Sequence, residues 1–343
     1  MNSMIKKTIV ISFLLIFQYV NATCILVEAE SFQDKGGWVL DQQFVFQMGS
    51  PYLLAHGLGK PVENARTEIK FNKKGNYNIW VRTMNWVPGN WKAPGRFRLV
   101  INEKEIMTDL GTNEGWGWQY VGKTNINKKN AILELKDLTG FDGRCDAIYF
   151  SKSPNPPPND LLSLEKWRRE FKKNAFENIN ILKYDLVVVG GGTAVCAAAI
   201  AAAEKGLNVA LIHDRPVLGG NASSEIRVHT LGQFGYFKRI ISKIDTKHYP
   251  NGSDEAFIDE EKRMKNMSFY SNIDLFLKWQ AIDAIAKDSI VQYVIASHIE
   301  TGDIIQFEAP FFSDCTGDGW IGYWAGAEYM YGRESKYEFD EGA

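Results

Sequence analysis

Residues 184–193 read YDLVVVGGGT, and after an alanine-rich run residues 209–214 read VALIHD. The apolar, β-branched run 186–189 predicts a parallel strand buried on both faces, and the glycines after it predict a tight turn. Residues 194–205 are mostly helix formers and end at Gly206, a good helix terminator. A second strand is expected at 208–212. The pattern predicts a strand, turn, helix and strand, with a phosphate group bound where the helix begins.

A glycine turn inside a βαβ unit of this length is typical of dinucleotide-binding folds. Two positions depart from that fingerprint. Val195 stands where a smaller residue would let the helix lie closer to the strand. His213 ends the second strand, where an acid would bind the ribose hydroxyls, so either Asp214 takes that role or His213 replaces the acid. A Rossmann-type layer that binds no nucleotide is the structural alternative.

Two later segments decide between dinucleotides. Residues 214–225, DRPVLGGNASSE, resemble the double-glycine continuation of FAD-binding flavoproteins. Residues 312–319, FSDCTGDG, resemble their later Thr-Gly-Asp motif. Together with the glycine turn, they resemble the FAD-dependent oxidoreductase family common in bacterial glycan-degradation loci. The resemblance covers the chain from Tyr184 to its end.

This resemblance implies FAD as cofactor. The turn and the start of the helix would hold the pyrophosphate, His213 or Asp214 the ribose, and Arg215 the adenine, with Asp318 on the ribityl or pyrophosphate side. The cofactor-binding candidates are Gly190, Gly191, Gly192, Thr193, His213, Asp214, Arg215, Gly219, Gly220, Asn221, Ser224 and Asp318.

Two residues after the double glycine, Glu225 and His229, are the candidate catalytic groups. Both can move a substrate proton, and their position in the motif implies that they lie toward the flavin ring. Glu225 has an alternative role, pairing with Arg227 or with a cofactor hydroxyl.

The composition is that of a soluble protein with room for two domains. The chain has 343 residues, 45% hydrophobic and 23% charged, with a net charge of −2. This near-neutral charge gives no support for nucleic-acid binding. Aromatic residues make up 13%, with ten tryptophans, many of them before residue 120, which favours a surface that handles sugars.

The N-terminus predicts export. Lys6 and Lys7 precede an apolar run, and small residues follow at 20–22, so residues 1–22 are interpreted as a signal peptide. The run is too short for a membrane span. We expect a periplasmic or secreted protein, with a lipoprotein anchor on Cys24 as the alternative. In an exported protein, Cys24 and Cys145 could form a disulfide.

Residues 24–152 predict an all-β sandwich, because short alternating strands recur between glycine, proline and asparagine. The opening LVEAESF at 26–32 and the segment CDAIYF at 145–150 resemble the first and last strands of family-6 and family-35 carbohydrate-binding modules, which have a jelly-roll fold. The resemblance implies that Glu28, Glu30 and Asp146 converge on a structural calcium ion, which prefers several hard oxygen ligands. A solvated strand face with an incidental acid pair is the alternative.

Tryptophans in glycine-rich loops are candidates for stacking on sugar rings. The alternative is that these tryptophans pack against the second domain, because an exposed tryptophan side chain is unfavourable unless another surface covers it. Arg96 and Asn102 are possible hydrogen-bond donors to a sugar. The tryptophan candidates are Trp38, Trp86, Trp91, Trp116 and Trp118.

The predicted fold class is therefore multidomain: a jelly-roll sandwich, then an α/β FAD-binding domain. A proline-rich linker and an amphipathic helix occupy residues 153–182, and the FAD-binding domain occupies residues 183–343. Flavoproteins of this type continue beyond such a point, so the chain is expected to be a fragment.

The predicted function is an exported FAD-dependent oxidoreductase that acts on a carbohydrate-derived substrate, with a glycan-binding module before it. Two alternatives stay open. In one, oxidation of a sugar leads to elimination and glycan cleavage. In the other, the protein binds glycans and its flavin domain does not function.

Overall fold

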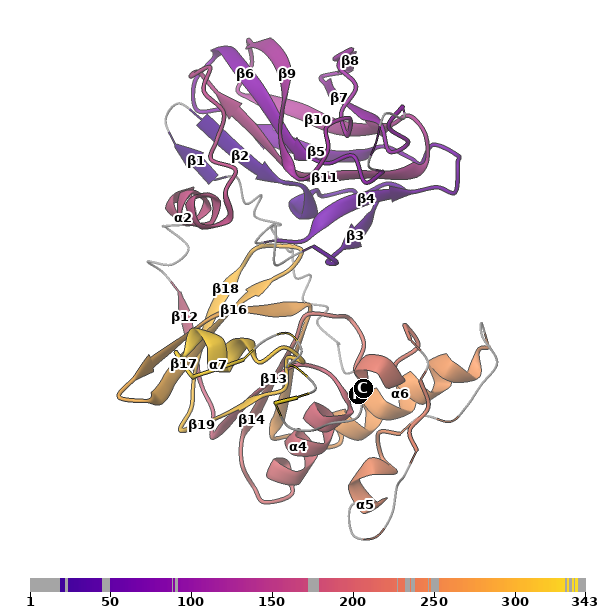
Figure 1. Cartoon of the computed structure of the whole chain (residues 1–343), viewed down its shortest axis with the longest axis vertical. Helices are drawn as coiled ribbons and strands as arrows, with labels where there is room; N and C mark the ends of the chain where they lie inside the picture. Colours follow the sequence, from indigo (N-terminus) through magenta and orange to yellow (C-terminus); the bar gives the residue numbers. More distant parts are fainter. Residues whose placement is uncertain are drawn as a thin grey trace, which may run out of the picture. The chain divides into compact units, whose positions relative to one another are not determined.

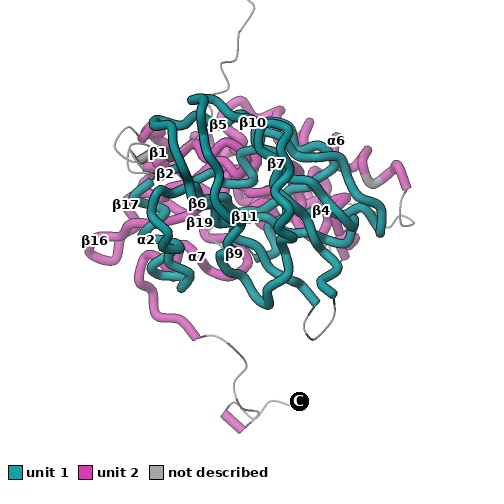
Figure 2. Tube along the Cα trace, turned by 90° about the horizontal axis from the view of Figure 1, so that it is seen from above, with its two compact units in different colours: residues 1–174 teal, residues 175–343 magenta. Residues whose placement is uncertain are grey.

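The computed structural model describes residues 19–21, 24–44, 50–87, 89, 92–171, 179–226, 228–231, 235, 238–245, 247, 253–330, 332, 335 and 337–338. The chain divides into two compact units, residues 1–174 and residues 175–343 (Figure 2). The predicted segment 153–182 is thus shared between the two units.

The first unit is an antiparallel β-sandwich, which confirms the predicted fold class (Figure 1). One sheet contains seven strands: β1 Tyr19–Asn21, β2 Cys24–Glu28, β3 Val39–Asp41, β4 Tyr52–His56, β6 Gly75–Thr83, β9 Gly117–Ile126 and β11 Phe141–Ser151. The other has the order β5-β10-β7-β8, with β5 Ala65–Lys70, β7 Phe97–Ile101, β8 Lys104–Glu105 and β10 Asn130–Asp137. Alternate residues of β5 and β10 are buried, so one face of their sheet lines the core.

Strands β2 and β11, which contain the two segments that resemble the first and last strands of carbohydrate-binding modules, are neighbours. Strand β2 pairs with β11 so that Cys24 lies opposite Ser151 and Glu28 opposite Ala147. Cys145 lies six residues from Ser151 along β11, about 20 Å away at the usual rise of a strand. A disulfide requires Cα atoms within about 7 Å, so Cys24 and Cys145 cannot form one, and both are free thiols.

Helix α2, Leu161–Phe171, packs on the first unit. Its Leu164 is buried, and its Trp167 contacts Trp118 and Tyr149 edge to face, with ring centroids 5.9 and 5.1 Å apart. The outer face of the seven-stranded sheet is therefore partly covered by this helix.

The second unit contains a four-stranded parallel sheet of order β15-β14-β13-β19. The elements are β13 Leu186–Val189, α4 Thr193–Ala203, β14 Val209–His213, β15 Ile273–Leu277 and β19 Phe311–Asp314. With the strands numbered in chain order this is 3-2-1-4, the arrangement of a Rossmann-type half. Buried alanines on α4, such as Ala199, let the helix pack closely on the sheet.

A second, mixed sheet has the order β12-β18-β17-β16, formed by β12 Asn180–Lys183, β16 Trp279–Lys287, β17 Ile290–His298 and β18 Ile304–Glu308. The remaining helices are α5 Lys238–Ile241, α6 Glu255–Ser268 and α7 Trp320–Trp324, with 3-10 turns at Ala29–Ser31 and Gly220–Ala222.

Two segments fold differently from what their sequence indicates. Residues 232–263 are polar, a pattern that predicts a loop, but α6 begins at Glu255. The sequence of residues 269–275 predicts a strand of the small sheet beside the dinucleotide fold, but the strand begins at Ile273 and pairs with β14 in the parallel sheet.

The predicted signal peptide falls mostly outside the described residues, apart from strand β1, which pairs with β2. Among the described residues, no helix is both long and apolar enough to cross a membrane.

Candidate functional site

The glycine turn between β13 and α4 is closely confined on one side and open on the other. Gly190 has φ +123°, and a Cβ atom there would overlap the carbonyl oxygen of Cys315. A Cβ atom at Gly191 would overlap the ring of His213. Gly192 is the N-cap of α4, and a Cβ atom there would meet nothing within 4 Å. The space is therefore open at the start of the helix, where free backbone amides favour an anion.

The double glycine lies against this turn, as the resemblance implied. The amide of Gly219 donates to the carbonyl of Gly191 at 2.7 Å, and Gly192 forms a β-bridge with Gly219. A Cβ atom at Gly220 would lie 3.1 Å from the Cα atom of Gly192. Gly219 and Gly220 have φ +118° and +56°, a conformation that favours glycine. Both glycines are thus needed for the close approach of the two loops.

The Thr-Gly-Asp segment also lies at the turn. The amide of Cys315 donates to the carbonyl of Val189 at 2.9 Å. Asp314 organises the segment: its carboxylate accepts hydrogen bonds from the amide and hydroxyl of Thr316 and from the amide of Gly322. Asp318 follows on an exposed loop before α7. Three segments distant in sequence therefore meet where α4 begins.

His213 is held firmly at the end of β14. Its side chain is buried, and its Nε2 lies 3.0 Å from the carbonyl oxygen of Val217, so Nε2 carries a proton there. Nδ1 lies 3.2 Å from the carboxylate of Asp214. Burial acts to raise the pKa of Asp214, but the hydrogen bond and charge of His213, together with the charge of Arg215, outweigh it and lower that pKa. Asp214 is therefore ionised and partly exposed, as a hydrogen-bond acceptor for hydroxyls must be.

The candidate catalytic residue Glu225 pairs with an arginine other than the one anticipated. Its Oε2 lies 3.1 Å from Nη1 of Arg215, a contact near the surface. Arg227 lies outside the described residues. His229 is half-buried and lies beyond Glu225 on the same loop. The structure thus joins Arg215 and Glu225, a pairing the sequence did not indicate.

The other cofactor-binding candidates lie around the turn. Thr193 is the first residue of α4 and is half-buried. The amide of Ser224 donates to Glu260 on α6 at 2.6 Å, and Asn221 is exposed. Val195, the larger residue at the third fingerprint position, is buried, with its Cγ2 close to Gly190. The valine is thus accommodated inside the unit.

These features fit a dinucleotide. The open N-terminus of α4 suits a pyrophosphate, the glycines remove side chains that would block it, and Asp214 can accept from ribose hydroxyls.

In the first unit, the three predicted calcium ligands converge around an arginine. Asp146 is fully buried, and its Oδ2 lies 2.6 Å from Nη2 of Arg168 on α2 and 3.1 Å from Nη1 of Arg82. Glu28 lies 3.2 Å from the same Nη2 of Arg168. The charge of Glu30 also acts on Arg168. No group of three or more His, Cys, Asp or Glu side chains in the described part of the chain is arranged to hold a metal ion. Calcium binding stays a prediction, and Arg168 is a competing source of positive charge.

Most of the candidate tryptophans are covered by other side chains. Trp38 is 2% exposed and packs on Phe97. Trp116 packs on Tyr52, and Trp118 on Trp167. Trp86 is 37% exposed, while Trp91 lies outside the described residues.

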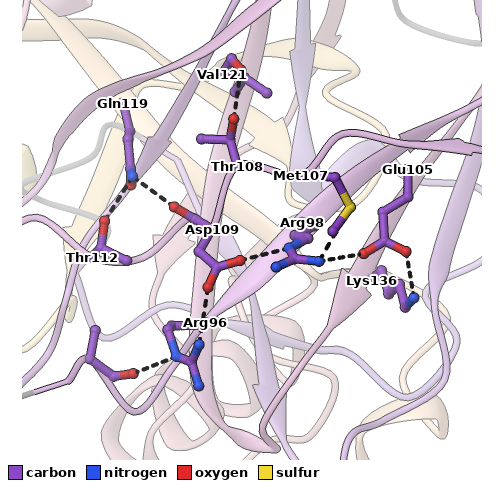
Figure 3. Close-up of polar contacts among 11 residues, drawn as sticks. Arg96, Arg98, Glu105, Met107, Thr108, Asp109, Thr112, Gln119, Val121 and Lys136 are labelled. Atoms are coloured by element: carbon purple, nitrogen blue, oxygen red, sulfur yellow. Dashed lines mark hydrogen bonds and ion pairs between the residues drawn. The ribbon is translucent and has the colours of Figure 1, made fainter.

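Arg96 and Asn102 are both engaged in the sandwich. Arg96 pairs with Asp109, which also binds Arg98, and Arg98 reaches Glu105 in turn (Figure 3). The side-chain oxygen of Asn102 accepts from the amide of Ile132. Arg96 is thus held by an ion pair within the sandwich, and Asn102 by a hydrogen bond to its oxygen.

A buried arginine that the sequence did not indicate completes the double-glycine loop. Arg263 on α6 is 1% exposed, and its guanidinium donates to the carbonyls of Ile244, Leu218 and Ala222 at 2.9, 2.8 and 3.2 Å. A Cβ atom at Gly219 would lie 2.8 Å from this guanidinium. In the sequence, this residue is visible only as one arginine in a polar stretch.

Comparison with known proteins supports the second unit's interpretation. Residues 185–343 match the family model described as FAD dependent oxidoreductase. A comparison with curated proteins found no match.

Three solved structures that resemble parts of this chain are as follows. An E. coli quinol fumarate reductase is 16% identical, covering 40% of this chain and 33% of its own, with a TM-score of 0.31. A geranylgeranyl bacteriochlorophyll reductase-like protein from Thermoplasma acidophilum is 20% identical over 43% of each chain, with a TM-score of 0.34. A family 35 carbohydrate-binding module from Clostridium thermocellum is 14% identical, covering 37% of this chain and 97% of its own, with a TM-score of 0.31.

TM-scores at this level support no conclusion about function. This chain spans about a third of the length of the fumarate reductase. The glycine turn, the double glycine and the Thr-Gly-Asp segment all lie inside the matched range. Residues 185–343 of this chain are therefore similar to the FAD dependent oxidoreductase family.

Proposed function

We propose that the second unit binds FAD and that the protein oxidises or reduces a carbohydrate-derived substrate outside the cytoplasm. The observation that carries the cofactor assignment is the meeting of three distant segments at the start of α4, around Gly192, Gly219 and Cys315. A loop arrangement that needs four confined glycines, at 190, 191, 219 and 220, is costly unless the open space beside it is used. The family match of residues 185–343 supports the same cofactor.

Each part of this site has a defined task. The amides at Gly192 and Thr193 would bind the pyrophosphate. Asp214 would accept from the ribose hydroxyls, and His213, fixed by Val217, keeps the carboxylate in place. Asp318 would lie on the ribityl or pyrophosphate side. FAD supplies hydride chemistry when bound, and the protein binds and orients it.

Glu225 and His229 are the proposed proton-transfer groups. Glu225 is held in place by the guanidinium of Arg215 at 3.1 Å, and a carboxylate is a group that can accept a proton. A Glu225→Gln variant that retains FAD should lose substrate turnover but still accept electrons from a chemical reductant. Turnover equal to that of the unaltered protein would exclude Glu225 as the base.

The carbohydrate substrate and the export signal rest on the sequence. Lys6, Lys7 and the apolar run after them support export, and the tryptophan-rich sandwich supports a glycan ligand. Within the sandwich, the surface ring of Trp86 is the candidate for contact with a sugar.

The visible absorbance spectrum of the purified full chain tests the cofactor. Saturation with FAD followed by gel filtration should leave the two-banded spectrum of an oxidised flavoprotein. Anaerobic addition of sugars and oligosaccharides should bleach it when the right substrate is present. A protein that is folded by circular dichroism yet leaves the column without flavin would contradict the proposal.

Two rival functions make different predictions in the same experiments. A glycan-binding protein with a non-functional flavin domain would show no flavin spectrum but would bind polysaccharides. A flavin-dependent glycan-cleaving enzyme would show the spectrum and would also release unsaturated or shortened products, seen by mass spectrometry.

A further inference from the structure

The guanidinium of Arg263 is a buried positive charge beside the double-glycine loop. Its side chain is 1% exposed, and its three hydrogen bonds are to the carbonyls of residues 244, 218 and 222. None of the ion pairs formed by the described residues includes Arg263. Its direct partners are neutral carbonyls, and the buried carboxylate of Asp259 lies one helical turn earlier on the same helix.

The double-glycine loop lies between the guanidinium of Arg263 and the predicted pyrophosphate position. Arg263 contacts the loop at Gly219, Gly219 binds the carbonyl of Gly191 at 2.7 Å, and its β-bridge partner Gly192 caps α4. A short chain of direct contacts therefore links Arg263 to the N-terminus of α4. Any change in the guanidinium alters both the shape of the loop and the potential at the open space.

We propose that Arg263 is a positioning residue for the dinucleotide: it fixes the double-glycine loop against the glycine turn and adds positive charge below the diphosphate. The inference rests on the proposed function, since it assumes that a pyrophosphate binds at Gly192. Arg263 does not contact the cofactor and has no part in hydride transfer.

Three variants of the full chain separate the contributions of charge and shape. Arg263→Gln removes the charge, Arg263→Lys keeps it but loses the forked hydrogen bonds, and Lys265→Gln removes an exposed charge from the same helix as a control. FAD affinity is measured by isothermal titration calorimetry at low and high salt, and apo-protein stability by urea unfolding. We expect Arg263→Gln to weaken FAD binding at least about tenfold at both salt concentrations, because salt screens a buried charge much less than an exposed one.

The control should bind FAD within about twofold of the unaltered protein, because its exposed charge is screened. Arg263→Lys keeps the charge and should weaken FAD binding less than Arg263→Gln even if the two variants unfold at the same urea concentration, a signature that loss of stability alone would not produce. Unaltered affinity in both arginine variants would overturn the inference. If Arg263→Gln does not fold, the FAD affinity of Arg263→Lys tests the inference by itself, and an unaltered affinity would overturn it. Failure of the unaltered protein to bind FAD would instead overturn the proposed function.

A separate observation in the first unit concerns the acidic pocket of Glu28, Glu30 and Asp146. Arg168 donates to Asp146 at 2.6 Å and to the hydroxyl of Ser50 at 3.0 Å, and its side chain is 5% exposed. Burial acts to lower the pKa of Arg168, but the charges of Asp146, Glu28 and Glu30 outweigh it and raise that pKa. Two guanidinium groups, Arg168 and Arg82, thus face three carboxylates.

We infer that Arg168 is the resident cation of this pocket, so that α2 locks the sandwich without a divalent ion. A buried carboxylate needs a positive partner, and removing that partner commonly costs about 3–5 kcal/mol. The same carboxylates would bind a divalent ion if the guanidinium were absent, because they are hard oxygen ligands.

The matched variants are Arg168→Met and Arg169→Met, since Arg169 is the next residue on α2 and is 49% exposed. Melting temperatures of the full chain are compared in chelator and in millimolar calcium. We expect neither chelator nor calcium to change the melting temperature of the unaltered protein or of Arg169→Met. Arg168→Met should melt at a lower temperature in chelator, and calcium should restore its melting temperature. If Arg168→Met does not fold, the chelator experiment on the unaltered protein still decides. A chelator-induced fall in its melting temperature, with one calcium per chain by elemental analysis, would overturn the inference and establish the calcium site.

Discussion

The carbonyl oxygen of Cys315 occupies the position that a side chain on Gly190 would need. This contact joins the end of β13 to the Thr-Gly-Asp segment, and Gly190 adopts φ +123° to allow it. A Gly190→Ala substitution combines strained backbone with an overlap against a main-chain atom. We expect it to reduce the free energy of unfolding by about 1–3 kcal/mol or more and to abolish FAD retention. Urea unfolding and flavin absorbance check the two effects.

Gly192 allows cofactor binding to be tested without loss of the fold. It caps α4 with φ −71°, and nothing lies within 4 Å of the position of its Cβ atom. Aspartate is a favourable N-cap residue, so Gly192→Asp should fold at least as stably as Gly192→Ala. Its carboxylate would repel a pyrophosphate, so FAD retention should be lost in Gly192→Asp and largely kept in Gly192→Ala. Full flavin occupancy in a folded Gly192→Asp variant would refute binding at this helix terminus.

The glycine segments could be predicted from sequence because their conformational demands are local. Gly190, Gly219 and Gly220 all adopt positive φ, which only certain residue types tolerate. Arg263 and Arg168 could not be found in this way. The three hydrogen-bond partners of Arg263 lie 45, 41 and 19 positions away, and Asp146 lies 22 positions from Arg168. Only the tertiary fold brings such groups together.

Helix α6 shows why a helix near the site was missed. Among the α6 residues whose burial is described, the buried ones are Asp259, Arg263 and Met267, spaced four residues apart, and two of these three are charged. Its apolar residues Phe257 and Ile258 are instead exposed. A search for apolar residues at helical spacing fails when the buried side chains are polar.

The contacts of the Glu204 carboxylate, just beyond the C-terminal end of α4, should be sensitive to acid. Hydrogen bonds from Arg239, Lys243 and Tyr270 lower the pKa of its carboxyl below the ordinary value of a glutamate. A carboxyl with a depressed folded-state pKa stabilises the fold above its unfolded-state pKa, and this stabilisation is lost as the pH falls through the folded-state pKa. Unfolding in urea at pH 7 and pH 3 should therefore show a smaller pH effect in Glu204→Gln than in the unaltered protein. Equal pH effects would show that the contact contributes nothing.

The thiol content of the chain follows from the register of β2 and β11. Because Cys24 and Cys145 are held far apart, the chain should keep four free thiols under oxidising conditions. Alkylation of the denatured, unreduced protein followed by intact mass spectrometry should add four labels per full chain. Two labels would show a disulfide and contradict the register.

The surface tryptophan Trp86 provides the test of glycan binding by the sandwich. It is 37% exposed, its Nε1 donates to the carbonyl of Phe141, and Arg144 lies over its ring at 5.6 Å. The ring is thus held in place at the surface rather than packed in the core. If it stacks on a sugar, Trp86→Ala should weaken glycan binding by about 2 kcal/mol or more, roughly thirtyfold. Affinity electrophoresis of the full chain against plant and microbial polysaccharides measures this.

Trp118 is the matched control, because its ring packs on Trp167 and Tyr149 and its Nε1 donates to the carbonyl of Pro158. Trp118→Ala should lower the melting temperature, since it opens a cavity between β9 and α2 and typically costs about 3–5 kcal/mol. Trp86→Ala should leave the melting temperature nearly unchanged. If no polysaccharide retards the unaltered chain, or if Trp86→Ala is retarded as strongly as the unaltered chain, then Trp86 is not a sugar-binding residue. Its ring would then serve only to hold Arg144 and the Phe141 turn at the edge of the sandwich.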